Sequence, residues 1–171
     1  LRSSEYHYRG LIESLCAISW EVRLDNYNYS YVSPQAGALL GYPLSDWLLE
    51  GFRSRLVHPD DLPWVHAYCD EEISSGRDHS VDYRVITAHR KTLWIRDIVS
   101  ITTHNQQPVL RGLMINISQS KETEEALRLS EEKFAKAFHA SPDGLLLTRQ
   151  RDGLLIEVNE GFSHISGYCS S

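Results

Sequence analysis

Histidines close to other metal-ligating or acid–base side chains are the first candidates for chemistry in this chain of 171 residues. His66 and Cys69 are three residues apart on one face of a predicted helix, a spacing that suits a pair of metal ligands. Because a structural zinc needs four ligands, we expect no metal site. His58 precedes Asp60 and Asp61. A helix start explains this cluster better than catalysis, with Asp60 as the cap.

Motifs for catalysis are absent from the sequence. It contains no glycine-rich phosphate loop, no Gly-x-Ser-x-Gly and no His-Glu-x-x-His, so we predict no catalytic residue. His139 lies in a Phe-His-Ala-Ser-Pro stretch that superficially matches a kinase phosphoacceptor box, but the repeat described below places it at a helix end. His66 could be an axial haem ligand. A lone histidine is a weak signal, a buried core histidine is the alternative, and haem is therefore disfavoured.

Composition is that of an ordinary globular protein, with 42% apolar and 23% charged residues and a net charge of −6. No basic cluster exceeds two residues, which argues against nucleic-acid binding. No apolar run approaches the roughly 20 residues that span a bilayer, so we expect no membrane contact. The three dispersed cysteines suit reduced thiols and a cytoplasmic location. Since the chain begins with Leu1, we expect it to be a piece of a longer protein.

One sequence pattern occurs twice, at an offset of 126 residues. Residues 31–42 read YVSPQAGALLGY and residues 157–168 read EVNEGFSHISGY, each a strand followed by a capped helix that ends in Gly-Tyr. A period this long indicates tandem domains. We therefore predict three segments: a complete module at 1–117, a linker helix at 118–139 and the opening of a second module at 140–171. Because this second copy lacks three of its five strands, we expect it to be disordered or to pack on a neighbouring molecule.

Hydrophobic periodicity predicts an α+β domain with sequential antiparallel strands, and helices gathered between the second and third of them. Alternation is strict at Ile18, Trp20, Val22 and Leu24, which indicates a half-buried strand. Ser33-Pro34 predicts a capped helix start, and Gly41 its end. The expected elements are helix 3–15, strand 17–24, a turn at Asp25-Asn26, strand 29–32, helices from 34, 44 and 60, strands 79–88, 91–103 and 109–117, and helix 118–139.

Five short motifs in a fixed order resemble a PAS domain, the small sensor module of signalling proteins. They are YVSPQAGALLGY at 31–42, VHPDD at 57–61, DYR at 82–84, LWI at 93–95, and GLMINIS at 112–118 leading into KETEEAL. The resemblance implies a five-stranded antiparallel sheet in the order 2-1-5-4-3 with helices on one face, followed by a long linker helix. It also implies a pocket between the sheet and the central helices, a downstream output domain and a homodimer through the flanking helices.

Three departures from the family pattern bear on function. His89-Arg90 replaces the usual Asp-Gly before the LWI motif, which leaves the hairpin type open. Asn116-Ile117-Ser118 replaces the usual Asp-Ile-Thr, which suggests a different contact between sheet and exit helix, because Asn116 cannot carry a carboxylate charge. The region after Gly41, YPLSDWLLE, holds no cysteine of the kind that light-sensing flavin members use, so a flavin–thiol adduct is disfavoured.

Pocket candidates are the aromatic and polar side chains that the resemblance places near the ligand site. We take Arg84 as a candidate anchor for a carboxylate or phosphate, with a surface ion pair as the alternative, since Arg84 shares a strand face with Asp82. For the aromatic residues, simple core packing is the alternative. The candidate set is Tyr31, Trp47, Phe52, His66, Arg84 and Trp94.

These features lead to one principal function hypothesis. The chain is a sensory module of a multidomain bacterial signalling protein, in which a small ligand or a change in dimer packing tilts the exit helix. The parent would be a cyclic di-GMP synthase or phosphodiesterase, or a histidine kinase. The alternative is a ligand-free interaction and dimerisation module, and an enzyme fragment has no support. An open cavity with an inward polar group would favour sensing, and a filled core would favour the alternative.

Overall fold

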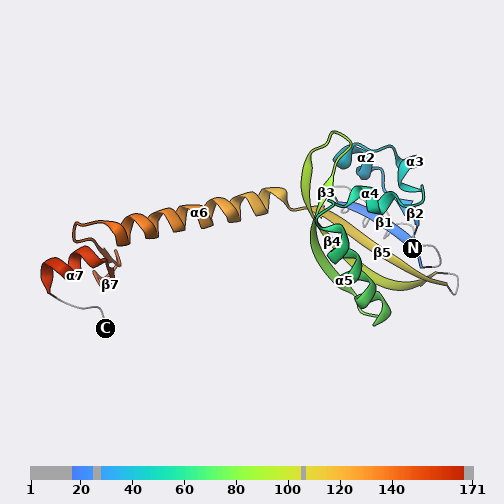
Figure 1. Ribbon diagram of the computed structural model, residues 1–171. Coiled ribbons are helices and arrows are strands. Elements are labelled where there is room, and N and C mark those ends of the chain that lie inside the picture. Colours follow the sequence, from blue (N-terminus) through green and yellow to red (C-terminus); the bar gives the residue numbers. More distant parts are fainter. Residues whose placement is uncertain (1–16, 25–27, 105–106, 168–171) are drawn as a thin grey trace. The chain divides into compact units, whose positions relative to one another are not determined.

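The computed structural model of the chain describes residues 17–24, 28–104 and 107–167 (Figure 1). The predicted helix 3–15, the turn at Asp25-Asn26 and two of the three cysteines lie outside the described residues. The chain divides into two compact units between Lys121 and Glu122.

The first unit is built on one antiparallel sheet of five strands in the order β2-β1-β5-β4-β3, which confirms the prediction. Its outer hairpins pair Tyr83 with Ile95 and Trp20 with Val32, and β1 crosses to pair with β5. The strands are β1 (Ile18–Arg23), β2 (Tyr29–Val32), β3 (His79–Ile86), β4 (Thr92–His104) and β5 (Gln107–Asn116).

Four helices lie between β2 and β3 in the sequence and cover the sheet (Figure 1). They are α2 (Gln35–Leu40), α3 (Leu44–Trp47), α4 (Phe52–Leu56) and α5 (Leu62–Ser74). Gly41 ends α2 with a φ of 77°, as predicted. The predicted Ser33 cap is wrong: the Ser33 hydroxyl accepts from the Ser19 backbone N–H at 3.1 Å and so joins β1 to the start of α2.

The core forms where the inward parity of the strands meets the helices. Ile18, Ile95 and Val99 are buried on the sheet, and Leu40 and Val65 on the helices. Burying each such side chain contributes about 1.5–3 kcal/mol relative to exposure. The predicted parity of β1 is therefore confirmed, and the sheet and helices enclose one apolar layer.

A glycine lets one large side chain lie across the sheet. Trp20 on β1 is the register partner of Gly112 on β5. A Cβ atom at Gly112 would come 2.3 Å from the Trp20 ring. Only glycine therefore allows the indole to cross β5 and reach the side chain of Asp97 on β4, which its Nε1 meets at 2.9 Å.

The β3–β4 hairpin turns through a residue in the left-handed region. Arg90 has a φ of 61°, at the position where the family pattern places glycine. Its N–H donates to the Thr87 carbonyl at 2.9 Å, and Thr87 N–H donates to the Lys91 carbonyl at 2.8 Å. These bonds make a three-residue loop with a left-handed third residue, which settles the hairpin type.

The second unit repeats the opening of the first. After α6 (Ser118–Ala140) come β6 (Leu146–Thr148), β7 (Leu155–Val158) and α7 (Glu160–Ser166). The bounds of β7 match those of β2 at the predicted offset, and Gly167 ends α7 with a φ of 75° as Gly41 ends α2. Leu145 N–H donates to Asn159 Oδ1 at 2.8 Å, the equivalent of the Ser19–Ser33 bond.

Residues 140–167 are thus described as a hairpin and a helix, where the sequence predicted disorder or packing on a neighbour. Their apolar side chains are nevertheless exposed, with Leu155 and Ile156 at 53% and 60%. This agrees with the reason behind the prediction, namely that two strands of a five-stranded sheet cannot bury their own apolar faces.

Candidate functional site

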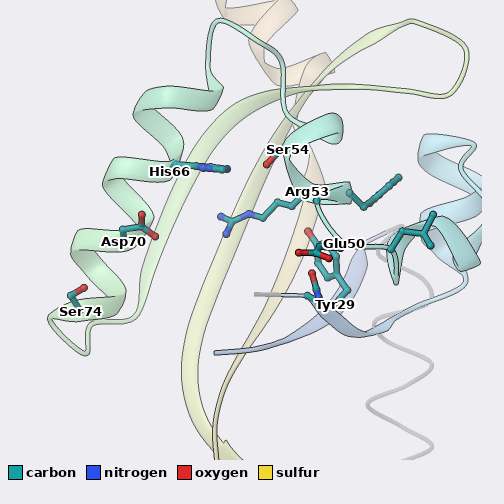
Figure 2. A pocket seen from close by; sticks show the side chains of 11 residues that line it. Tyr29, Glu50, Arg53, Ser54, His66, Asp70 and Ser74 are labelled. Atoms are coloured by element: carbon teal, nitrogen blue, oxygen red, sulfur yellow. The ribbon is translucent and has the colours of Figure 1, made fainter. Parts of the chain in front are cut away.

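A cleft of about 520 Å³ opens between α4, α5 and the start of β2. Figure 2 shows that Arg53 extends from α4 toward α5, while His66 extends from α5 into the same space. Both helices present polar side chains here because apolar residues on their other sides, such as Leu56 and Val65, are buried in the core. The lining residues are Asn28, Tyr29, Leu49, Glu50, Gly51, Phe52, Arg53, Ser54, His66, Asp70 and Ser74.

Arg53 is the cation at the floor of this cleft. Among the described residues its one hydrogen bond is from Nη2 to the Cys69 sulfur at 3.4 Å, a weak acceptor, and no carboxylate lies within ion-pair distance. Burial opposes its charge, but the nearby Tyr29 and Tyr83 and the Asp97 carboxyl raise the pKa of Arg53. The guanidinium therefore stays charged, and most of its five donors have no hydrogen-bond partner among the residues that the structure describes.

His66 contributes a neutral imidazole to the same cleft. Burial lowers the pKa of His66, and the positive charge of Arg53 lowers it further, against a smaller opposing effect of Asp70. At neutral pH the ring can both donate and accept a hydrogen bond. The His66 side chain lines the cleft. Cys69, one helical turn further along α5, is buried in the core.

Behind the cleft, Asp97 is buried on the inner face of β4 with 1% of its surface exposed. Trp20 Nε1 donates to one carboxyl oxygen at 2.9 Å and the Tyr83 hydroxyl donates to the other at 3.0 Å. Burial raises the pKa of Asp97 to about 6, although Arg53 and these two hydrogen bonds act in the opposite direction. The core thus contains an acid that titrates close to physiological pH.

Tyr29 and Arg53 separate the outer cleft from an inner void, since both residues line each of them. The inner void lies between the sheet and the helices, where the family resemblance implied the ligand pocket, and it measures about 10 Å³. That is about the space of one water molecule. The expected inner pocket is therefore filled, and a void of this volume has no room for a flavin or a haem. The open cavity lies outside it, between α4 and α5.

Three of the six predicted site residues lie at or directly beneath the cleft. Phe52 and His66 line it. Trp47 is fully buried beneath it, with its ring centre 5.2 Å from that of Tyr29 and 5.0 Å from that of Phe52. Its Nε1 is buried without a hydrogen-bond partner among the described residues. Trp47 thus acts as core, the alternative raised for the aromatic residues.

The other three predicted site residues lie away from the cleft. Tyr31 is on β2 and 50% exposed. Arg84 forms an ion pair with Asp61, with Nη2 2.6 Å from the carboxylate, so an acid already occupies the proposed anchor. The Arg84 guanidinium also stacks 5.9 Å from the centre of the Trp94 ring, on the outer face of the sheet. The ion-pair alternative describes Arg84 correctly, but its partners are Asp61 and, at 3.4 Å, Asp60, and not Asp82.

The cluster at His58, Asp60 and Asp61 is structural, but its predicted capping is wrong. Asp61 occupies the cap position of α5 and makes no side-chain cap bond. Its carboxylate instead accepts from the Arg84 backbone N–H at 2.9 Å, and the Arg84 side-chain bonds hold the pKa of Asp61 below its usual value. This pair ties the start of α5 to β3.

The residues that sequence reasoning missed are Arg53 and Asp97. Asp97 carried a usable signal, because it shares the inward parity of Ile95 and Val99 and an acid in that register must be buried. Arg53 carried none, because the five-residue helix α4 is too short for a periodic pattern to reveal which side faces a cavity.

The first turn of α6 is fastened to the sheet at Trp94. The Trp94 backbone N–H donates to the Ser118 hydroxyl at 2.9 Å, and Ile117 N–H donates to the Trp94 carbonyl. Lys121 Nζ lies 5.5 Å from the centre of the Trp94 ring and 3.5 Å from an Asp82 carboxylate oxygen. Asn116 Oδ1 accepts from Ser118 N–H, so the amide that replaces the family's carboxylate shapes the helix start.

Family comparisons match both units. A model described as "PAS fold" matches residues 29–114, and one described as "PAS domain" matches residues 132–171. A methyl sulfide methyltransferase-associated sensor of Methanosarcina acetivorans is 31% identical over 97 residues, 54% of this chain and 10% of that protein. Sensor protein FixL of Bradyrhizobium diazoefficiens is 28% identical over 82% of this chain and 28% of its own length. The chain thus spans under a third of these relatives.

Solved structures give the same result. The N-terminal domain of a diguanylate cyclase with PAS/PAC sensor from Marinobacter aquaeolei is 33% identical, with a TM-score of 0.55 over 61% of this chain and 98% of that one. A sensory box histidine kinase/response regulator from Burkholderia thailandensis is 23% identical, with a TM-score of 0.61 over 75% of this chain and 98% of that one, and shows the fold.

Within residues 17–24, 28–104 and 107–167 no group of three or more His, Cys, Asp or Glu side chains could hold a metal ion. None of the helices described there is long and apolar enough to cross a membrane.

Proposed function

The chain belongs to the PAS family, and from that premise we propose that it senses a small ligand and relays the change through α6 to a downstream output domain of the same protein. One observation carries the proposal: the start of α6 is fastened to β4 by Ser118 and Lys121 at Trp94. A shift of β4 therefore moves the first turn of the helix. The relatives include sensor proteins, among them a diguanylate cyclase with a PAS/PAC sensor, and this supports a signalling output of that class.

The second candidate is a ligand-free interaction and dimerisation module. The inner void of about 10 Å³ favours it, because no small molecule fits between the sheet and the helices. The outer cleft and its charged Arg53 favour sensing. In both cases we propose a homodimer through the flanking helices.

Ser118→Ala tests the relay, with Ser118→Thr as the matched control. Alanine removes the acceptor of the Trp94 N–H, whereas threonine keeps a hydroxyl and is the residue of the family pattern. We expect Ser118→Ala to speed amide hydrogen exchange at Trp94 and in the first turn of α6, and to change the output of the full-length protein. Threonine should leave both as in the wild type. Equal exchange and equal output in both variants would refute the relay.

A further inference from the structure

The outer cleft combines one cation with two acids in a way that selects for a ligand of mixed charge. Within the described ranges, Arg53 has one weak acceptor, Cys69, for its five donors. It is not among the described residues with a buried, unpartnered polar atom, so its remaining N–H groups are reachable from the cleft. A planar guanidinium that is charged and unpaired is suited to a bidentate carboxylate.

Acidic side chains in the same cleft exclude most anions. Asp70 on α5 and Glu50 before α4 both line it, and neither forms an ion pair with Arg53 within the described residues, where the guanidinium bonds to Cys69. Figure 2 shows the Arg53 side chain directed at the stretch of α5 that carries His66 and Asp70. A phosphate or a dicarboxylate would place two or more negative charges beside these two carboxylates, against a single cation.

We infer that the cleft binds a small zwitterion of the α-amino acid class. Its carboxylate accepts from Arg53, its ammonium group lies beside Asp70, and its side chain rests against Phe52 and Leu49. The neutral His66 ring supplies a further hydrogen bond without adding charge. The cleft of about 520 Å³ has room for any natural amino acid. The inference deepens the proposed sensing function by naming the class of stimulus.

The experiment measures binding of the 171-residue chain to the proteinogenic L-amino acids, supplied singly, by calorimetry and thermal shift. Each is compared with the amine that lacks its carboxylate and the acid that lacks its amine. We expect at least one amino acid to bind, and both analogues to bind at least roughly tenfold more weakly, since each loses one charged contact. No binding by any amino acid, or equal binding of the deaminated acid, would overturn the inference.

Three variants assign the contacts. Arg53→Met keeps the length of the side chain and should weaken binding roughly 30-fold or more. Asp70→Asn should weaken binding of the amino acid, whose ammonium group loses its carboxylate partner. It should strengthen binding of the deaminated analogue, because a charge that repels the analogue's carboxylate is removed. Ser54→Trp fills the cleft from an exposed position without touching the Arg53–Cys69 contact, so it tests the site even if Arg53→Met unfolds the protein. Unchanged binding in Ser54→Trp would place the ligand elsewhere and overturn the assignment.

Failure here and failure of the relay are distinguishable. The Ser118 variants are compared without any ligand, so a relay can exist for another stimulus even if no amino acid binds. Conversely, amino acids that bind at Arg53 while Ser118→Ala has no effect would support the ligand class and remove the proposed path to the output domain.

Discussion

Asp97 is a carboxyl group whose environment stabilises the protonated form. It accepts two hydrogen bonds, from Trp20 and Tyr83, yet its burial outweighs them and the Arg53 charge, so its pKa rises from 3.8 to about 6. His79 on β3 also lowers the pKa of Asp97, by a smaller amount than these groups. At pH 7 the core therefore holds a carboxylate at a cost in stability, and this cost depends on pH.

The sign of this pH dependence follows from linkage. Between about pH 4 and 6 the folded chain keeps a proton on Asp97 that the unfolded chain has released, so stability falls as pH rises through this window, by roughly 3 kcal/mol. Asp61 and Asp82 have the opposite effect on stability, because their pKa values are lowered in the folded chain. Their contribution is lost as pH falls below the usual pKa of an aspartate. The difference in unfolding free energy between the wild type and a variant changed only at Asp97 isolates the contribution of this residue.

Asp97→Asn should therefore remove this contribution. An asparagine keeps an acceptor for Trp20 and can donate to the Tyr83 hydroxyl oxygen, but it does not titrate. We expect the variant to gain stability relative to wild type as pH rises from 4 to 7, measured by urea unfolding across that range. A constant difference between the two proteins at every pH would show that Asp97 does not titrate in the window.

Arg90 makes a second prediction at the residue scale. A non-glycine residue in the left-handed region costs about 1–2 kcal/mol. Glycine relieves this strain, but it also makes the unfolded chain more flexible, which offsets part of the gain. With φ at 61°, Arg90→Gly should raise the free energy of unfolding by roughly 0.5–1 kcal/mol. Arg90→Ala, which keeps a Cβ, should change it little. A gain of equal size in both variants would assign the effect to the lost side chain.

At the scale of elements, the sheet was predictable and the cleft was not. Alternation at Ile18, Trp20 and Val22 depends on two faces with different surroundings, and neighbouring residues encode that directly. The cleft depends on how far α4 stands from α5, which is set by packing between residues distant in sequence. Arg84 shows the same limit, because its partner Asp61 is 23 residues away and nothing local distinguishes it from Asp82.

Gly112 provides the sharpest test of how the strands are packed. Gly112→Ala places a methyl group into the Trp20 ring, which must move and release its bond to Asp97. We expect a loss of roughly 2–4 kcal/mol in the free energy of unfolding, from overpacking and a buried carboxyl left with one partner.

Gly37→Ala is the matched control for Gly112→Ala. Gly37 lies inside α2, where an added Cβ meets its nearest neighbour at an ordinary 3.6 Å. Alanine there should stabilise the helix by roughly 0.5–1 kcal/mol. Both variants are compared by chemical denaturation. If Gly112→Ala cost no more than Gly37→Ala, the Trp20 ring would not lie over β5 as described.

At the scale of the whole molecule, the exposed apolar side chains of α6 bear on the proposed dimer. Leu127 and Phe134 are seven residues apart and 60% and 54% exposed, which is the spacing of a coiled-coil stripe. Most of the remaining surface of the helix is charged, as in the Arg128 pairs with Glu125 and Glu132. In a single solvated helix these apolar side chains stay exposed to water, which is unfavourable, whereas a two-stranded coiled coil would bury them.

Leu127→Glu with Phe134→Glu should therefore weaken dimerisation, because carboxylates would face each other across the helix pair. We expect the double variant to dissociate at protein concentrations at least roughly tenfold higher than wild type in analytical ultracentrifugation, since each buried apolar side chain contributes about 1.5–3 kcal/mol. Leu129→Glu is the control, as Leu129 is also apolar and 41% exposed but lies two positions from Leu127, toward the opposite side of α6. It should leave the dimer intact. Equal weakening in both proteins would place the dimer contact outside the α6 stripe. A monomeric wild type would refute the proposed homodimer, and the relay would then have to act within a single chain.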